Sequence, residues 1–140
     1  MPDQPFDRRP AGCTDATVDA VGKLSAALET VEVARGHLYA FHRLTGTADF
    51  EAEEAADLLD RAGHGDLAAE LRRDLIGRNV LEGRWTFQVV EDYDTGYYAA
   101  FQRLEAGVRG QLVDGQRHVH ESELKEQRRT PGQPGHDAAP

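Results

Sequence analysis

The spacing of apolar residues constrains the fold of this chain more than any other feature. Between Val21 and Phe41, apolar side chains recur at steps of three and four residues. Such steps align side chains along one stripe of an α-helix, whereas a half-buried strand requires alternation. The spacing therefore predicts a long helix over residues 17–44. We expect Thr45 and Gly46 to end it, because glycine adopts the left-handed conformation that closes many helices.

Shorter and longer helical patterns follow along the chain. Residues 49–62 and 66–76 are separated by a glycine-containing turn and predict a short helical hairpin. Two glycines and an asparagine interrupt the pattern over residues 77–83, which predicts a loop. Heptad-like steps then predict a second long helix over residues 86–114. Residues 85–90 also alternate like a strand, but the sequence offers no second strand to pair with it.

These elements predict an all-α protein, a small helical bundle of two long antiparallel helices and a short helical hairpin, with disordered termini. The bundle domain covers residues 14–115. A leader over residues 1–13 and a tail over residues 130–140 are rich in Pro, Gly and Asp, so neither buries enough apolar surface to become ordered. Residues 116–129 are highly charged and form at best an exposed helical extension.

The charge balance excludes several classes of partner. A formal net charge of -9 repels nucleic-acid phosphates and anionic membranes. The hairpin resembles a helix-turn-helix with Arg72, Arg73 and Arg78 on its second helix, but its acidic first helix disfavours DNA binding. No segment has the apolar length of a membrane span or a signal peptide. We therefore expect a soluble cytoplasmic protein that binds neither nucleic acid nor membrane.

Residues 85–101 combine most of the aromatic rings of the chain with three carboxylates, Glu91, Asp92 and Asp94. Aromatic rings favour burial, whereas a buried carboxylate needs a partner, so this segment requires a specific neighbour. A second set of polar side chains lies on the helix predicted over residues 17–44. Its members are three or four residues apart and therefore share one face: Glu32, Arg35, Tyr39 and His42. The candidate ligand pocket from both segments comprises Glu32, Arg35, Tyr39, His42, Trp85, Glu91, Asp94 and Tyr97.

Each half of this pocket also has a purely structural interpretation. The acids of residues 85–101 can face water while the rings pack inside. Arg35 and Glu32 can likewise form an ion pair at the edge of the core, bordered by Tyr39 and His42. If the acidic line turned inward instead, it would meet Arg35 or His42 and form either a buried ion-pair network or a pocket for a cationic ligand.

The sequence assigns no catalytic, cofactor-binding or metal-binding residues. Long antiparallel helices with carboxylates invite comparison with ferritin-like di-iron proteins, and Glu29, Glu32, Glu91 and Asp94 would supply half a carboxylate shell. The Glu-x-x-His motifs of that class are missing. The run from His118 to Glu121 contains two histidines and a glutamate, but a polar tail usually keeps such groups in water.

Two segments, ARGHLYAFHRLTG over residues 34–46 and GRNVLEGRWTFQVVEDYD over residues 77–94, resemble those of a group of small helical proteins from high-GC Gram-positive bacteria. The resemblance extends over about residues 18–129. It implies a soluble cytoplasmic helical protein, and it carries no activity and no site.

Two functional hypotheses follow. The first is a non-enzymatic protein-interaction module, most simply a homodimer, because the apolar stripes of two long helices are wider than a short hairpin can cover. The second is a small-molecule-binding protein or enzyme that uses the acidic and aromatic pocket described above. A ferritin-like carboxylate-metal protein is a weaker variant of the second hypothesis.

Overall fold

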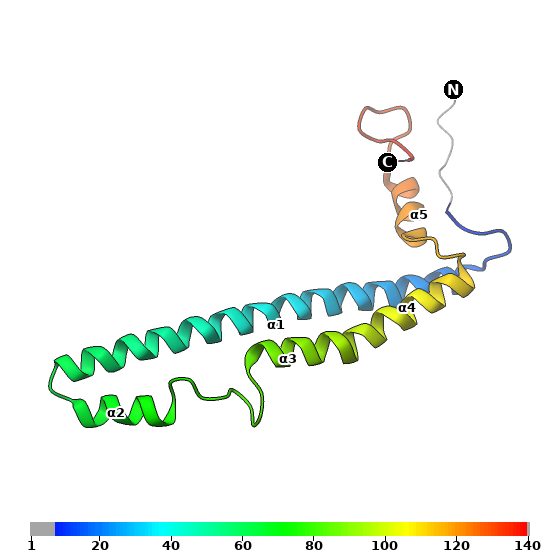
Figure 1. Cartoon of the computed structure of the whole chain (residues 1–140). Coiled ribbons are helices and arrows are strands. Elements are labelled where there is room, and N and C mark those ends of the chain that lie inside the picture. Colours follow the sequence, from blue (N-terminus) through cyan, green and yellow to red (C-terminus); the bar gives the residue numbers. More distant parts are fainter. Residues whose placement is uncertain (1–7, 140) are drawn as a thin grey trace. The chain divides into compact units, whose positions relative to one another are not determined.

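The computed structural model of the chain describes residues 8–139, and its regular secondary structure is helical (Figure 1). The elements in chain order are α1 (Asp15–Arg61), α2 (Gly65–Asp74), α3 (Thr86–Tyr93), the π-helical segment η1 (Asp94–Tyr98), α4 (Ala99–Leu112) and α5 (Val119–Arg128). The predicted all-α class is confirmed. None of the described helices has a stretch long and apolar enough to cross a membrane.

The chain divides into two compact units, which we describe separately. The middle unit is Glu32–Tyr98, and the terminal unit combines Met1–Val31 with Ala99–Pro140. Helix α1 contributes its first part to the terminal unit and its remainder to the middle unit.

Helix α1 continues through the predicted stop at Gly46, so the expected break between residues 44 and 49 is wrong. The helix predicted over residues 49–62 is the C-terminal part of α1. A glycine inside a helix costs only about 1 kcal/mol relative to alanine, and the Ala- and Glu-rich stretch that follows favours helix enough to outweigh it. Asp49, expected to open a separate helix, instead accepts a hydrogen bond of 2.9 Å from the backbone N–H of Gly77.

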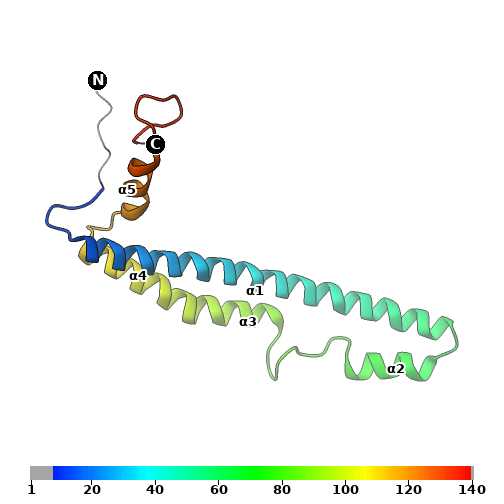
Figure 2. The ribbon, with the colours of Figure 1, turned by 180° about the vertical axis from the view of Figure 1, so that it is seen from behind.

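The end of α1 and helix α2 form the predicted hairpin of the middle unit. Gly63 has a φ of 88°, the left-handed conformation that a glycine supplies without steric strain. Arg72 on α2 donates to Asp57 at 2.7 Å and to Asp60 at 2.6 Å, both on α1. Both ribbon views show α2 beside α1, connected by the short turn (Figures 1 and 2).

The loop predicted over residues 77–83 is present, and α3 follows it directly. The backbone N–H of Trp85 donates to the side chain of Gln88 at 3.0 Å, which satisfies one of the free donors at the start of the helix. The helical hydrogen bonding from Thr86 onward shows that the strand interpretation of residues 85–90 is wrong.

The predicted helix over residues 86–114 is interrupted by η1. Within this tract the hydroxyl of Thr95 donates to the backbone carbonyl of Glu91 at 2.9 Å, and Gly96 lies one residue further on. Both features weaken regular α-helical hydrogen bonding, which explains why the wider π turn forms here. Such turns are frequent at functional sites, and η1 contains Asp94 of the predicted pocket.

A cluster of four buried valines forms the core of the terminal unit: Val18, Val21, Val113 and Val119. Cys13 and Val108 pack against this cluster. Val119 is the first residue of α5, so the charged extension predicted over residues 116–129 is helical from that point and contributes to the core.

A buried ion pair lies within the terminal unit. Glu105 on α4 is 6% exposed and receives hydrogen bonds from Arg109 at 3.0 Å and from the hydroxyl of Ser25 on α1, also at 3.0 Å. The hydrogen bond from Arg109, followed by that from Ser25, lowers the pKa of Glu105 although its burial acts in the opposite direction. Arg109 also donates to the backbone carbonyl of Gly115, so its guanidinium is held on two sides.

Both ends of the chain make contacts within the terminal unit. Of the predicted leader, residues 1–7 lie outside the described part of the chain. Arg9 forms ion pairs of 2.6 Å with Glu123 of α5 and with Asp15 of α1. In the tail, the backbone N–H of Thr130 donates to the ring of His136 at 3.1 Å.

Candidate functional site

Arg35 of α1 lies at the centre of a polar cluster in the middle unit. Its guanidinium donates to both carboxylate oxygens of Asp94, at 2.8 and 3.0 Å. Its Cζ atom lies 4.6 Å from the ring centroid of Tyr98 and 5.0 Å from that of Tyr39. A bidentate ion pair and two aromatic faces therefore fix the same cation.

The π-helical segment supplies the partners of Arg35. Asp94 and Tyr98 are the first and last residues of η1, four residues apart, and both point toward α1. The hydroxyl of Tyr98 donates to the carboxylate of Glu32, and this hydrogen bond raises the pKa of Tyr98 above its ordinary value. Tyr93 stacks on Tyr98 with ring centroids 6.4 Å apart.

The charged groups Arg35 and Asp94 of this cluster neutralise each other. The hydrogen bond from Arg35 lowers the pKa of Asp94, so the carboxylate stays ionised and the pair stays intact at neutral pH. Asp94 occupies two of the three guanidinium nitrogens of Arg35, Nε and Nη2, and neutralises its charge. The geometry thus favours a structural role for Arg35 over anion binding.

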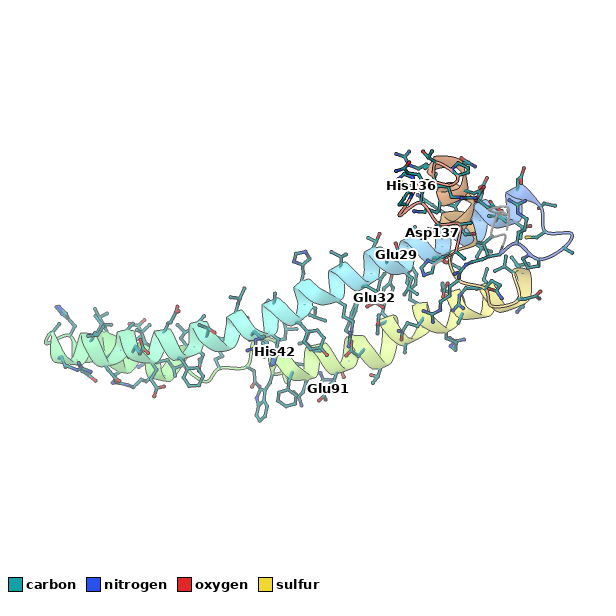
Figure 3. All side chains as sticks on the ribbon, turned by 90° about the horizontal axis from the view of Figure 1, so that it is seen from above. Glu29, Glu32, His42, Glu91, His136 and Asp137 are labelled. Atoms are coloured by element: carbon teal, nitrogen blue, oxygen red, sulfur yellow. The ribbon has the colours of Figure 1, made fainter. Side chains whose placement is uncertain are left out.

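Of the remaining residues of the predicted pocket, Tyr97 contacts the edge of this cluster, with its ring centroid 5.8 Å from that of Tyr93. His42 forms a separate contact, with its Nδ1 atom 2.7 Å from the hydroxyl oxygen of Thr86. Glu91 is exposed (Figure 3). Tyr97 is 59% exposed. Trp85 is 57% exposed and packs edge-on against Phe87, with ring centroids 5.3 Å apart. The predicted set is therefore spread over several separate contacts rather than one pocket.

The carboxylates of the middle unit do not share a metal centre. Glu32 binds Tyr98, Asp94 binds Arg35, and Glu91 is exposed. The geometry of these residues does not support the half shell expected of a ferritin-like protein. The arginines of the hairpin are similarly engaged, since Arg72 pairs with acids of α1 and Arg73 pairs with Asp74.

A cavity of about 690 Å³ lies in the middle unit, between α1 and the loop that precedes α3. Small side chains of α1, including Gly46, Ala48 and Ala52, form one wall. The opposite wall is formed by Leu75, Gly77, Arg78, Asn79, Val80, Trp85 and Thr86. The volume suits a small ligand, and the lining combines apolar surface with a few polar groups, as ligand sites do.

The middle unit also leaves large apolar side chains exposed on α1. Leu44 is 67% and Phe50 is 69% exposed, and Val33 and Leu58 are similarly uncovered. Val33, Leu44 and Leu58 are separated by 11 and 14 residues, close to whole numbers of helical turns, so they share one face. Arg35 and His42 lie on the opposite face toward η1 and α3. We call Val33, Leu44 and Leu58 the outer face of α1. Phe41 and Phe50, nine residues apart, lie at its two opposite edges.

Buried residues are scarce in the same unit. Within its described residues, the buried apolar side chains are Ala56, Ala68 and Val90. Two of these are alanines, which contribute little apolar area. The middle unit thus has a small core beside an exposed apolar face, an unusual combination for a monomer.

Sequence reasoning missed two features of these sites. The predicted pocket does not include Tyr98, although its four-residue step from Asp94 indicates a shared face. Arg78 and Asn79 line the cavity through a loop conformation that helical periodicity cannot predict.

No known protein family, no curated protein and no solved structure matches this chain. The resemblance noted in the sequence analysis therefore stays a prediction.

Proposed function

We propose that this protein is a protein-interaction module that associates with a second copy of itself through the outer face of α1. The observation that carries this proposal is the contrast between the small core of the middle unit and the exposure of Val33, Leu44, Leu58 and their aromatic neighbours. A second copy removes this surface from water, and each Å² of apolar surface buried contributes about 25 cal/mol.

The exposed side chains of the outer face and its edges contribute part of the area that a dimer buries. A stable interface buries about 800 Å² on each partner. An aromatic side chain supplies about 150–250 Å² when fully buried, so half-exposed rings such as Phe41 and Phe50 leave about 100 Å² each for an interface.

The charges beside the outer face suit a second copy better than a strongly basic or acidic partner. Along α1, Arg43 and Arg61 lie on either side of Glu51 and Glu54 in sequence. In a symmetric interface the same patch meets itself, so an arginine of one copy can face a glutamate of the other. A patch of one sign would repel itself in this arrangement.

A charge substitution on the outer face tests the proposal. Replacing Leu44→Glu puts a carboxylate into the interface, and we expect the dimer dissociation constant to rise about a hundredfold. The matched control is Leu104→Glu on α4, where the leucine is 57% exposed but belongs to the terminal unit. Sedimentation velocity should show monomers for the first variant and dimers for the second. Equal behaviour of the two variants would contradict the proposal.

A second candidate function is the binding of a small anionic molecule in the cavity beside Trp85. The cavity offers the guanidinium of Arg78 for the charge and the side chains of Leu75, Val80 and Trp85 for an apolar part. Trp85 is the only tryptophan of the chain, so its fluorescence reports on the cavity directly. We expect aromatic carboxylates to change this fluorescence in the wild type and not in Arg78→Gln. No response across a panel of carboxylates would remove this candidate.

A further inference from the structure

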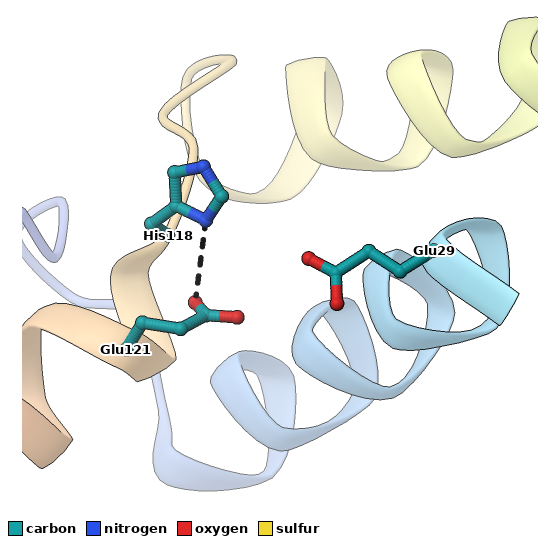
Figure 4. A group of neighbouring side chains, drawn as sticks. All are labelled: Glu29, His118 and Glu121. Atoms are coloured by element: carbon teal, nitrogen blue, oxygen red, sulfur yellow. Dashed lines mark ion pairs between the residues drawn. The ribbon is translucent and has the colours of Figure 1, made fainter. Parts of the chain in front are cut away.

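Three side chains of the terminal unit converge from two separate segments of the chain (Figure 4). Glu29 lies on α1, His118 immediately precedes α5, and Glu121 lies in the first turn of α5. Each offers one ligand atom, and these atoms lie within 4.8 Å of one another. Figure 4 shows the two carboxylates and the imidazole pointing toward a common point.

The distances suit a shared ion better than a direct hydrogen bond. The Nδ1 atom of His118 is 3.8 Å from Oε2 of Glu121, longer than the usual 2.7–3.2 Å of a hydrogen bond. Two ligands of one tetrahedral Zn²⁺, each about 2.1 Å from the metal, lie about 3.4 Å apart. Small rotations of these exposed side chains reach that separation. The pair of carboxylates also concentrates negative charge beside one imidazole, which favours a divalent cation.

A cavity adjoins two of the three residues, His118 and Glu121. It has a volume of about 400 Å³, and the rest of its lining combines the cations Arg8 and Lys125 with Ser122, Gly135, Asp137, Ala138 and Ala139. Three protein ligands leave at least one position of a metal ion open, and this space can hold the water or small ligand that fills it.

The neighbouring histidine does not take part. His120 lies over Gly22, where an added Cβ atom would be 3.3 Å from the Cβ atom of His120. The residues from His118 to Glu121 therefore do not all face water as expected: His120 packs beside Gly22, and His118 and Glu121 face Glu29. The structure separates the two histidines and replaces the second with Glu29, a residue distant in sequence.

We propose that Glu29, His118 and Glu121 form a binding site for a divalent transition-metal ion, with the open coordination position facing the cavity beside α5. Imidazole with carboxylates suits Zn²⁺ and its neighbours, whereas Ca²⁺ and Mg²⁺ prefer oxygen ligands alone. The bound ion joins α1 to α5, so it stabilises the attachment of α5 within the terminal unit. This site is independent of the self-association proposed for the middle unit.

Titration calorimetry of the full chain with Zn²⁺ tests the site. The wild type should bind one equivalent, and His118→Asn and Glu29→Gln should each weaken binding by at least about tenfold, because each removes one ligand. Asparagine tolerates the left-handed conformation of His118, whose φ is 61°, so this variant should keep the fold. Glu29→Gln preserves shape and helix and provides an independent second variant.

The matched control is His37→Asn, which removes an exposed histidine of the middle unit and should leave Zn²⁺ binding unchanged. Circular dichroism confirms that each variant is folded. No Zn²⁺ binding by the wild type, or equal affinity in either ligand variant, would overturn the proposal. Equal affinity of the wild type for Ca²⁺ would also overturn it, because that result indicates an unspecific acidic surface.

Discussion

The two units of this chain use the same kind of helix in opposite ways. The terminal unit buries a cluster of four valines and contains a buried ion pair between Glu105 and Arg109. The middle unit buries mainly alanines, and its ion pair between Arg35 and Asp94 is about a quarter exposed. Helical periodicity alone therefore does not determine how much of the apolar surface of a helix is buried. The terminal unit buries its valines within itself, whereas the exposed apolar side chains of the middle unit are the surface that we propose a second copy covers.

The strongest test of this contrast removes the buried carboxylate of the terminal unit. Glu105→Ala leaves the guanidinium of Arg109 without its ion-pair partner, and breaking such a buried pair costs about 3 kcal/mol of unfolding free energy. The comparison variant Asp94→Asn in the middle unit should cost clearly less, because its pair is partly in water. Urea unfolding monitored by circular dichroism measures both. Equal losses would remove the distinction between the two units.

The second test follows the middle unit with the fluorescence of Trp85. If a second copy completes this unit, its unfolding depends on protein concentration by mass action. A concentration a hundredfold above the dissociation constant stabilises the folded state by about 2.7 kcal/mol, which corresponds to several degrees in Tm. A midpoint that does not change with concentration would mean that the middle unit is stable without a partner.

The third test uses pH. The hydrogen bond from Arg35 lowers the pKa of Asp94 in the folded state below its unfolded value. The pair therefore stabilises the protein above the unfolded pKa, and this contribution is lost as pH falls through the folded pKa. Between about pH 5 and pH 2, the wild type should lose more stability than Asp94→Asn. Parallel losses in the two proteins would show that this ion pair contributes nothing.

The smallest effect concerns the continuity of α1. Gly46 lies inside the helix, and an added Cβ atom meets no atom within 4 Å. Gly46→Ala should therefore stabilise the protein by up to about 1 kcal/mol. The control Gly63→Ala should destabilise it, because Gly63 has a φ of 88°. Destabilisation by Gly46→Ala would support the helix break that the sequence predicts there.

The sequence predicted the helical elements well where periodicity decides them. The hairpin turn at Gly63, the loop over residues 77–83 and the start of a helix at Thr86 all follow from local residue chemistry. The continuity of α1 could not be predicted in the same way. A Thr-Gly pair favours a stop locally, but the helix formers that follow and the contact from Asp49 to Gly77 decide the outcome.

The candidate site was predicted in part. The spacing on two antiparallel helices left open whether Asp94 faces water or meets Arg35 or His42, and the structure contains the pair with Arg35. The exposure of Glu91 and Tyr97 depends on the path of the chain through η1, which periodicity does not reveal. The convergence of Glu29 with His118 and Glu121 joins residues about ninety positions apart, and only the tertiary structure brings them together.

The central claim is that a second copy covers the outer face of α1. Sedimentation equilibrium of the wild-type chain across low to high micromolar concentrations measures this directly. The account predicts a mass that rises from one chain to two chains as concentration increases. A mass of one chain throughout that range would contradict it.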